Sequence, residues 1–430
     1  MNWSTPPLKH LLLAAGSGTW GRPPKSSEPA YPVLRSTNIQ DGRLQFDSTP
    51  LRSVSEKAAS KYLLKLGDVL VTTSSGSPRL LGKNAIVEEL PGRGGKFLFS
   101  NFTWRLRPDP KVLVPKYLYY YLNSPGARAE LARIQSTTSG LRNLDTKLYL
   151  IQPVPVPTLP EQHRIVEILD RIGELRQLRT EADAKADRAL PAALVRVLGN
   201  PANWQSDPCC EPLGKVATPV SGATPSKRVE DFWQGSVPWV SPKDMKVEFL
   251  SDSQDHVSEA AVQGTNLKLI EQGSALVVVR GMILARSVPL AINLTPVTIN
   301  QDMKALVPRT EETTGTYLWA ALTAAKPQLK TLVRTAGHGT RKLDTPDLME
   351  FRIPRPDPDQ IRQVHSVAET HRQLVERRQK SVLSINRLFT LLLHKAFGGS
   401  LTAAWREAYS AALREDSRDR HVAGPMEGVA

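Results

Sequence analysis

Residues 139–147 read Ser-Gly-Leu-Arg-Asn-Leu-Asp-Thr-Lys, and residues 338–346 read His-Gly-Thr-Arg-Lys-Leu-Asp-Thr-Pro. The Gly, Arg, Leu, Asp and Thr of the two segments match at a constant offset of 199 positions. In each copy a proline-rich stretch follows and leads into Pro-Glu-Gln at 160–162 or Pro-Asp-Gln at 358–360. A duplicated order of this kind indicates an internal repeat. The sequence therefore predicts one structural unit that is used twice.

Each copy ends in a stretch with the periodicity of an amphipathic helix. Apolar residues recur every three or four positions over 161–197 and over 361–396, which is the spacing of one helical face. Helices of this length with such a seam are typical of coiled coils, and we expect the two to pack antiparallel. The seam candidates are Ile165, Ile172, Leu175, Val364, Val382 and Ile385. Pro191 interrupts the first pattern, so a kink or break is expected about one turn before it.

Between the two helical stretches the sequence changes character. Short β-rich runs such as 68–73 and 275–279 alternate with prolines, glycines and polar loops, and long helical patterns are missing there. This favours the mixed α/β (α+β) class, with two similar globular domains that are each followed by a long helix. The expected boundaries are 1–157 for the first domain, 158–200 for the central helix, 201–357 for the second domain, 358–398 for the C-terminal helix and 399–430 for a tail.

The charge is unevenly distributed along the 430 residues. Of 56 Lys and Arg against 42 Asp and Glu, residues 1–157 hold 21 against 10, whereas residues 205–357 balance at 17 each. A basic excess is typical of proteins that bind a polyanion. The first domain would then supply most of the non-specific affinity for nucleic acid.

The composition and the cysteine count exclude several classes of protein. The two cysteines are neighbours, Cys209 and Cys210, and cannot form a disulfide framework or a four-ligand zinc site. There is no run of about 18 apolar residues and no signal peptide. We therefore expect a cytoplasmic protein that does not associate with a membrane.

Two glycine-rich segments resemble nucleotide-binding motifs but lack essential parts. Gly16–Gly21 satisfies Gly-x-Gly-x-x-Gly, yet prolines follow where a dinucleotide site needs a helix. Residues 76–83 imitate a P-loop, with five residues between the glycines and Asn84 where Ser or Thr should bind magnesium. The Asn/Asp-Pro-Pro-Tyr/Phe tetrapeptide of amino-methyltransferases is missing, and the eight histidines show no metal spacing; His163, His365 and His371 are expected on solvated helix faces. We expect no catalytic residue, cofactor site or metal site on this chain.

The polar loop at 72–83 is a candidate DNA contact, because short side chains and two cations follow a strand there. A solvated hairpin is the alternative. Arg142 and Arg341 occupy the same place in both copies, and either a domain–helix salt bridge or a phosphate clamp would explain them. The candidate DNA-binding residues are Arg35, Asn38, Thr73, Ser74, Ser75, Ser77, Arg79, Lys83, Arg142, Lys243, Arg280, Arg286 and Arg341.

With these motifs in view, the chain resembles the specificity (S) subunit of type I restriction–modification enzymes. The resemblance is carried by Pro-Glu-Gln-His-Arg-Ile-Val at 160–166, by the Gly-x-Arg-x-Leu motif before it, and by Lys-Ala-Phe-Gly-Gly-Ser-Leu-Thr-Ala-Ala-Trp-Arg at 395–406. The Tyr-Pro pair at 31–32 and Leu-Gly-Asp-Val-Leu at 66–70 also match its target-recognition domains. The resemblance covers about residues 7–406. The second copy departs from the family pattern, because Gly273-Ser274 stands where the family usually has Gly-Asp.

The resemblance implies a non-catalytic subunit with two target-recognition domains held apart by two antiparallel helices. Each domain would read one half of an asymmetric, bipartite site in double-stranded DNA. The helices would dock two modification subunits, which carry S-adenosylmethionine and methylate adenine, and two restriction subunits that use ATP and magnesium would join for cleavage. The alternatives are the targeting subunit of a related modification system outside type I, a nucleotide-dependent enzyme, and a coiled-coil adaptor.

Overall fold

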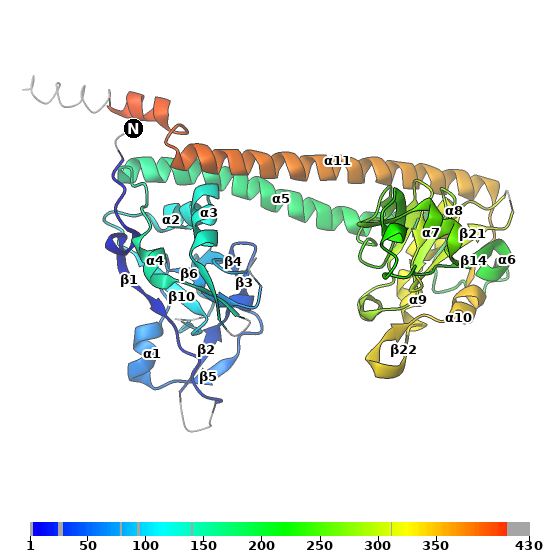
Figure 1. Cartoon of the computed structure of the whole chain (residues 1–430), viewed down its shortest axis with the longest axis horizontal. Helices are drawn as coiled ribbons and strands as arrows, with labels where there is room; N and C mark the ends of the chain where they lie inside the picture. Colours follow the sequence, from blue (N-terminus) through cyan, green and yellow to red (C-terminus); the bar gives the residue numbers. More distant parts are fainter. Residues whose placement is uncertain are drawn as a thin grey trace, which may run out of the picture. The chain divides into compact units, whose positions relative to one another are not determined.

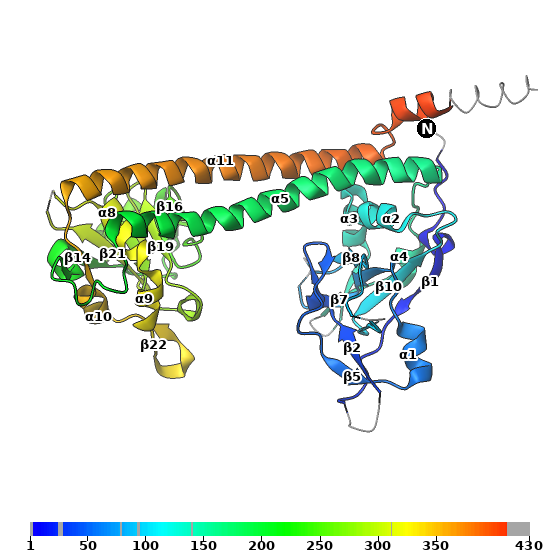
Figure 2. The same ribbon diagram turned by 180° about the vertical axis from the view of Figure 1, so that it is seen from behind.

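The computed structural model describes residues 3–24, 29–77, 80–92, 95–138, 141–310 and 312–410. The chain forms two compact units, the first made of Met1–Leu178 and Val382–Ala430 and the second of Arg179–Ser381. Each unit contains one globular domain and part of each of the two long helices (Figure 1, Figure 2). The division between the units therefore falls inside the long helices.

The first unit is a mixed α/β domain built on a four-stranded antiparallel sheet of order β1-β10-β6-β8. These strands are β1 (Leu12–Ser17), β10 (Thr103–Pro108), β6 (Val69–Thr72) and β8 (Asn84–Ile86). A second sheet has the order β5-β2-β9, with β2 (Ala30–Leu34) parallel to β9 (Leu98–Phe99) and antiparallel to β5 (Leu51–Ser53). The strands β3 (Ile39–Gln40) and β4 (Arg43–Leu44) form a small hairpin, and the short helices are α1 (Glu56–Tyr62), α2 (Pro115–Leu122), α3 (Pro125–Arg133) and α4 (Thr146–Ile151).

The second unit repeats this plan. Its main sheet has the order β14-β21-β18-β19-β16, and a three-stranded sheet has the order β17-β15-β20. The strands are β14 (Ala217–Ser221), β21 (Met303–Pro308), β18 (Ala275–Val278), β19 (Leu290–Asn293), β16 (Phe249–Leu250), β17 (Asp255–Val257), β15 (Val237–Val240) and β20 (Thr298–Ile299). The strand β13 (Cys210–Pro212) pairs with β24 (Arg352–Pro354), and the helices are α6 (Leu213–Val216), α7 (Glu259–Gly264), α8 (Gly315–Ala324), α9 (Lys326–Thr331) and α10 (Thr345–Glu350). The strand order of the first sheet thus recurs, which confirms the internal repeat and the α+β class.

The two β-rich runs of the sequence form the central strands of the two sheets. All four residues of β6 and all four of β18 are buried. An uninterrupted apolar run suits a strand that is covered on both faces. In the first unit Tyr117 and Leu118 of α2 belong to the same apolar core as Val69 and Val71 of β6.

The expected long helices are α5 (Leu159–Leu198) and α11 (Pro358–Phe397). Of the kink or break expected before Pro191, the break is wrong, because α5 is helical on both sides of this residue. A proline inside a helix costs about 3 kcal/mol. Burial offsets that cost here, since Leu190, Leu194 and Leu198 pack with Trp204 in the core of the second unit.

Within each unit the long helices pack antiparallel. In the first unit Ile165 and Leu169 of α5 share a core with Leu393 and Ala396 of α11, and Glu161 near the start of α5 accepts a hydrogen bond from Thr402, just beyond the end of α11. The guanidinium of Arg176 lies 4.8 Å from the ring centre of Phe389. These contacts join early residues of α5 to late residues of α11, as an antiparallel pair requires.

In the second unit an ion pair joins the helices in addition to the apolar core that includes Leu194 of α5 and Val364 of α11. Arg378 interrupts the apolar seam of α11, and its Nε and Nη2 donate to the carboxylates of Asp183 and Asp187 on α5 at 2.8 and 2.7 Å. The seam residues differ in burial. Ile165 and Val364 are fully buried, Ile172, Val382 and Ile385 are half-buried, and Leu175 is 48% exposed, so that Leu175 lies outside the seam.

His371 of α11 is buried, contrary to the expectation of a solvated face. Its Nε2 pairs with the carboxylate of Glu248, which precedes β16 in the same unit. Burial would raise the pKa of Glu248, but the hydrogen bond and charge of His371, together with the charges of Lys326 and Arg378, hold that pKa below its usual value. The histidine therefore fastens α11 to the second globular domain.

Candidate nucleic-acid interface

In the first unit the chain leaves β6 and forms a small polar sheet. The strand β7 (Ser74–Ser75) pairs with β12 (Leu141–Leu144), which pairs with β11 (Gln135–Thr138). Arg142 stands opposite Ser75, and the hydroxyl of Ser74 donates to the amide oxygen of Asn143 at 2.7 Å. The structure therefore brings together three of the candidates, Ser74, Ser75 and the exposed Arg142, from segments 67 residues apart.

The loop that follows β7 is held at its base and open at its tip. Leu81 is buried, and the backbone N–H of Thr72 donates to the carbonyl of Lys83 at 2.8 Å. Gly82 has φ +69°, and a side chain there would collide with Leu131. A β-carbon at Gly76 would meet open space, Ser77 and Lys83 are half-buried, and Arg79 lies outside the described residues. The loop is thus a hairpin between β6 and β8 that presents polar groups.

Some of the candidates have structural roles in the first unit. Asn38 is buried; its Oδ1 accepts from the backbone N–H of Arg35 at 2.9 Å, and its Nδ2 donates to the carbonyl of Gln45. Thr73 is also buried and donates to the carbonyl of Phe102 at 3.2 Å. These hydrogen bonds engage both side chains within the fold of the first unit. Arg35 is half-buried, and its buried Nε has no hydrogen-bond partner among the described residues.

The corresponding place in the second unit is more basic. Strand β23 (Arg341–Lys342) pairs with β22 (Arg334–Thr335), and Arg280 forms a backbone bridge to Lys342. Arg286 is exposed at the end of the 3-10 turn η4 (Met282–Ala285), which lies against β23. Arg341 donates to the hydroxyl of Thr335 at 2.5 Å. The structure therefore gathers Arg280, Arg286 and Arg341 around the end of β18.

Lys243 lies elsewhere in the second unit. Its amino group pairs with Asp255 at 2.6 Å, so its charge is compensated within the protein. Neither Arg142 nor Arg341 forms an ion pair with a long helix in the described part of the chain. The phosphate clamp therefore stays a prediction for both arginines.

Several arginines of the first domain are hydrogen-bonded within the domain. Arg107 is bound to Asp68 at 2.6 Å, and this hydrogen bond raises the pKa of Arg107. Burial lowers the pKa of Arg105, whose guanidinium donates to the carbonyl of Leu63. Arg128 donates to the carbonyl of Gly82 and supports the base of the loop. Three of the arginines thus support the fold.

Exposed apolar residues beside the basic cluster were not predicted from the sequence. Met282 and Ile283 follow Gly281 in η4, and their side chains are 65% and 38% exposed. Their position in the sequence could have indicated them, because they stand between the candidate residues Arg280 and Arg286. Lys342 was also not predicted. It follows the repeated Arg341, but the first copy has Asn143 at the matching position, so the repeat does not identify it.

The segments that resemble nucleotide-binding motifs have other roles. The backbone N–H groups of Gly18 and Thr19 donate to the carbonyls of Thr103 and Phe99, and a side chain at Gly18 would lie 1.9 Å from the Phe99 oxygen. Arg22 then pairs with Ser53. The chain continues along the second sheet of the unit, and Gly18 and Gly21 are needed for close packing.

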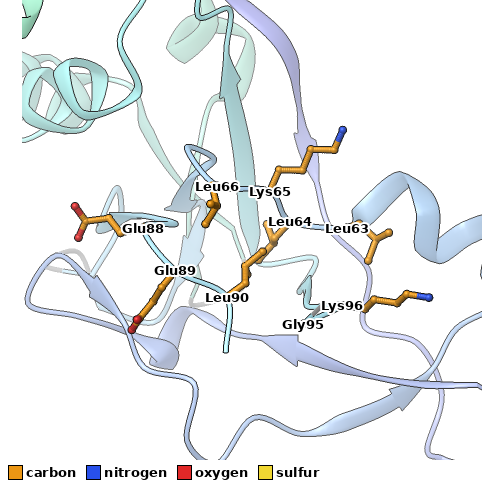
Figure 3. A pocket seen from close by; sticks show the side chains of 9 residues that line it. All are labelled: Leu63, Leu64, Lys65, Leu66, Glu88, Glu89, Leu90, Gly95 and Lys96. Carbon is orange, nitrogen blue, oxygen red and sulfur yellow. The ribbon is translucent and has the colours of Figure 1, made fainter. Parts of the chain in front are cut away.

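The first domain also contains a pocket of about 600 Å³. Four leucines line it, Leu63, Leu64, Leu66 and Leu90, together with four charged residues, and Figure 3 shows the amino groups of Lys65 and Lys96 directed away from the leucines. Its lining offers apolar contact rather than a polar cradle for a phosphate. Among the described residues, no group of three His, Cys, Asp or Glu side chains could hold a metal ion, and no helix is long and apolar enough to span a membrane.

Comparison with known proteins assigns the family. The model of the type I restriction modification DNA specificity domain matches twice, over residues 22–186 and 211–371. The two matches cover most of the chain, and each contains one of the two globular domains. The chain therefore belongs to the type I restriction–modification DNA specificity family and contains its domain twice.

Similar proteins include the specificity subunit of the type I restriction enzyme EcoR124I/EcoR124II from Escherichia coli. It is 31% identical over 263 residues, which are 58% of this chain and 61% of that protein. The MjaIX specificity subunit from Methanocaldococcus jannaschii is 28% identical over 172 residues, or 39% of this chain and 38% of that one. The matched regions thus span less than two thirds of these relatives.

A solved structure of a type I restriction–modification system, described for its complex assembly and conformational transition, is similar in fold. It is 20% identical with a TM-score of 0.58, and the match covers 93% of this chain and 98% of that one. At this identity the likeness concerns the fold alone.

Proposed function

We propose that this chain is the DNA-recognition subunit of a type I restriction–modification complex. Each globular domain would read one half of a bipartite site in double-stranded DNA. The observation that carries the proposal is the double match to the DNA specificity domain, over residues 22–186 and 211–371. The domains differ in sequence, so the two half-sites would differ and the whole site would be asymmetric.

In each domain the proposed DNA-facing surface is the polar sheet beside the end of the central strand. Ser75 and Arg142 represent it in the first domain, and Arg280 and Arg341 represent it in the second. Arginines and short hydroxyl side chains are the common donors to DNA phosphates and base edges. The equivalence of the two places in the repeat supports a common role.

The long helices would dock two modification subunits and, with them, two restriction subunits. In the first unit Leu175, Leu178, Leu383, Leu388 and Leu391 are exposed on α5 and α11. Exposed leucines on long helices are typical of surfaces that bind another protein. The modification subunits would carry S-adenosylmethionine and methylate adenine, the restriction subunits would use ATP and magnesium, and this chain would contribute no catalytic group. The complex would act in the cytoplasm.

Selection from a random duplex library tests the proposal. The full chain, co-expressed with its modification subunits, should enrich one sequence made of two unlike half-sites at a fixed spacing. The wild-type complex and a variant with Arg142 and Arg341 both changed to Ala are compared at the same salt concentration. Enrichment of no common sequence by the wild-type complex would contradict the proposed function.

A further inference from the structure

The turn after β18 exposes an apolar tip on a rigid base. Gly281 has φ +130°, a conformation that favours glycine. Leu284 is 1% exposed and anchors the turn in the core, whereas Met282 is 65% exposed. The backbone N–H of Gly281 donates to the carbonyl of Arg341 at 3.0 Å, so the turn is attached to β23. The tip is therefore held in a defined place.

Cations surround this tip. Arg280 precedes it and Arg286 follows it, and both are exposed. Within the described residues neither forms an ion pair, whereas Lys342 is paired with Asp344 and Arg334 with Asp347. An apolar tip between two exposed guanidinium groups matches a duplex groove, where phosphates line the rims and base edges form the floor.

We propose that Met282 reads a thymine by contact with its 5-methyl group in the major groove. This assignment rests on the proposed function. The thymine methyl is the apolar group that the major-groove edges of the base pairs display. Methionine suits it, because its flexible and polarizable side chain adapts to an irregular apolar surface. Arg280 and Arg286 hold the tip in the groove through the phosphates on either side.

The first unit has different chemistry at the same place. Its loop is anchored by Leu81, which is 1% exposed like Leu284, and it also exposes the apolar Leu80 at 46%. The residue directly after Gly76 is the polar Ser77, whereas Met282 follows Gly281. The anchor is thus shared and the tip differs. Two domains that read unlike half-sites require such a difference, in which the exposed residue changes while the buried leucine that anchors the loop is kept.

Replacement of thymine by deoxyuridine tests the assignment, because deoxyuridine lacks only the methyl group. Each thymine of the selected site is replaced in turn, and the affinity of the complex of the full chain with its modification subunits is measured. For the wild-type complex one replacement in the half-site of the second domain should weaken binding about three- to fivefold, as expected for the loss of one buried methyl group. The Met282→Ala complex should bind thymine and deoxyuridine at that position equally, and Met282→Leu should restore the difference.

Leu269→Ala is the matched control, since Leu269 is an exposed apolar residue of the same unit. The Leu269→Ala complex should distinguish thymine from deoxyuridine as the wild-type complex does. All three variants should unfold at the wild-type temperature. A Met282→Ala complex that still distinguishes the two bases, a wild-type complex insensitive at every thymine, or a second half-site without an A·T pair would overturn the assignment. Absence of any sequence-specific binding by the wild-type complex would instead contradict the proposed function.

Discussion

Replacement of Arg378 by alanine should destabilise the second unit. The Arg378 side chain on α11 is 13% exposed, and it donates to the carboxylates of Asp183 and Asp187 on α5 and to the backbone carbonyl of Asp183. No other ion pair joins the two helices in the described part of this unit. The alanine variant would leave Asp183 with Arg179 as its remaining partner and Asp187 with none.

The free energy of unfolding that Arg378→Ala should lose lies between two limits. Exposed ion pairs contribute about 0–1 kcal/mol, and loss of one partner of a fully buried pair costs about 3–5 kcal/mol. Arg378 is mostly buried, but the carboxyl group of Asp187 is 67% exposed and Asp183 keeps a second partner. We therefore expect a loss of about 2 kcal/mol. In a unit of this size that lowers the midpoint of thermal unfolding by about 4–8 °C.

The loss of stability caused by Arg378→Ala should depend on pH. The hydrogen bond from Arg179, followed by that from Arg378, lowers the pKa of Asp183 in the folded state. A carboxyl group with a lowered pKa stabilises the fold above its unfolded pKa of about 3.9, and that contribution disappears as the pH falls through the folded value. The difference between wild type and Arg378→Ala should be full at pH 7 and decrease below about pH 4.

Differential scanning calorimetry of the full chain measures this difference. Arg377→Ala is the matched control, because Arg377 is exposed on the same helix and forms no ion pair among the described residues; its midpoint should stay within about 2 °C of wild type. Equal midpoints for wild type and Arg378→Ala at pH 7 would refute the interhelical role of Arg378.

Three further outcomes are expected. The chain purified from cells without modification subunits should neither methylate nor cleave DNA, which a radiolabelled methyl-transfer assay and a plasmid cleavage assay check; robust methyl transfer would contradict the non-catalytic role. Lys83→Ala should lower affinity for all DNA sequences and flatten the plot of log affinity against log salt by about one unit, if Lys83 neutralises one phosphate; an unchanged slope would remove Lys83 from the interface. Leu169→Asp, which places a charge in the core that joins the long helices, should cost at least about 3 kcal/mol by denaturant unfolding, whereas Leu175→Asp at an exposed position should change stability by less than about 0.5 kcal/mol.

The repeat made much of the fold predictable from the sequence. Two copies of the Gly-x-Arg-x-Leu-Asp-Thr motif in the same order imply one fold used twice, and the apolar period of 161–197 and 361–396 predicts long helices. These features are local, because periodicity and repetition do not depend on which distant residues come into contact.

The features that the sequence did not predict depend on tertiary contacts. Pro191 remains helical because of the core around Leu194, and His371 is buried because Glu248 approaches it from the globular domain. Asn38 has the residue type of a DNA contact, yet the turn at 35–45 uses both of its amide atoms. Polar residues in a loop do not reveal from sequence alone whether they face the solvent or the chain itself.

We propose that this chain directs DNA modification through two unlike domains. Single-molecule sequencing of a genome that encodes the chain with its modification subunits tests it most directly. We expect methylated adenines in one asymmetric motif of two different half-sites with a fixed gap, and loss of that motif when the chain is deleted. A palindromic or uninterrupted motif, or a modification pattern that survives the deletion, would contradict the account.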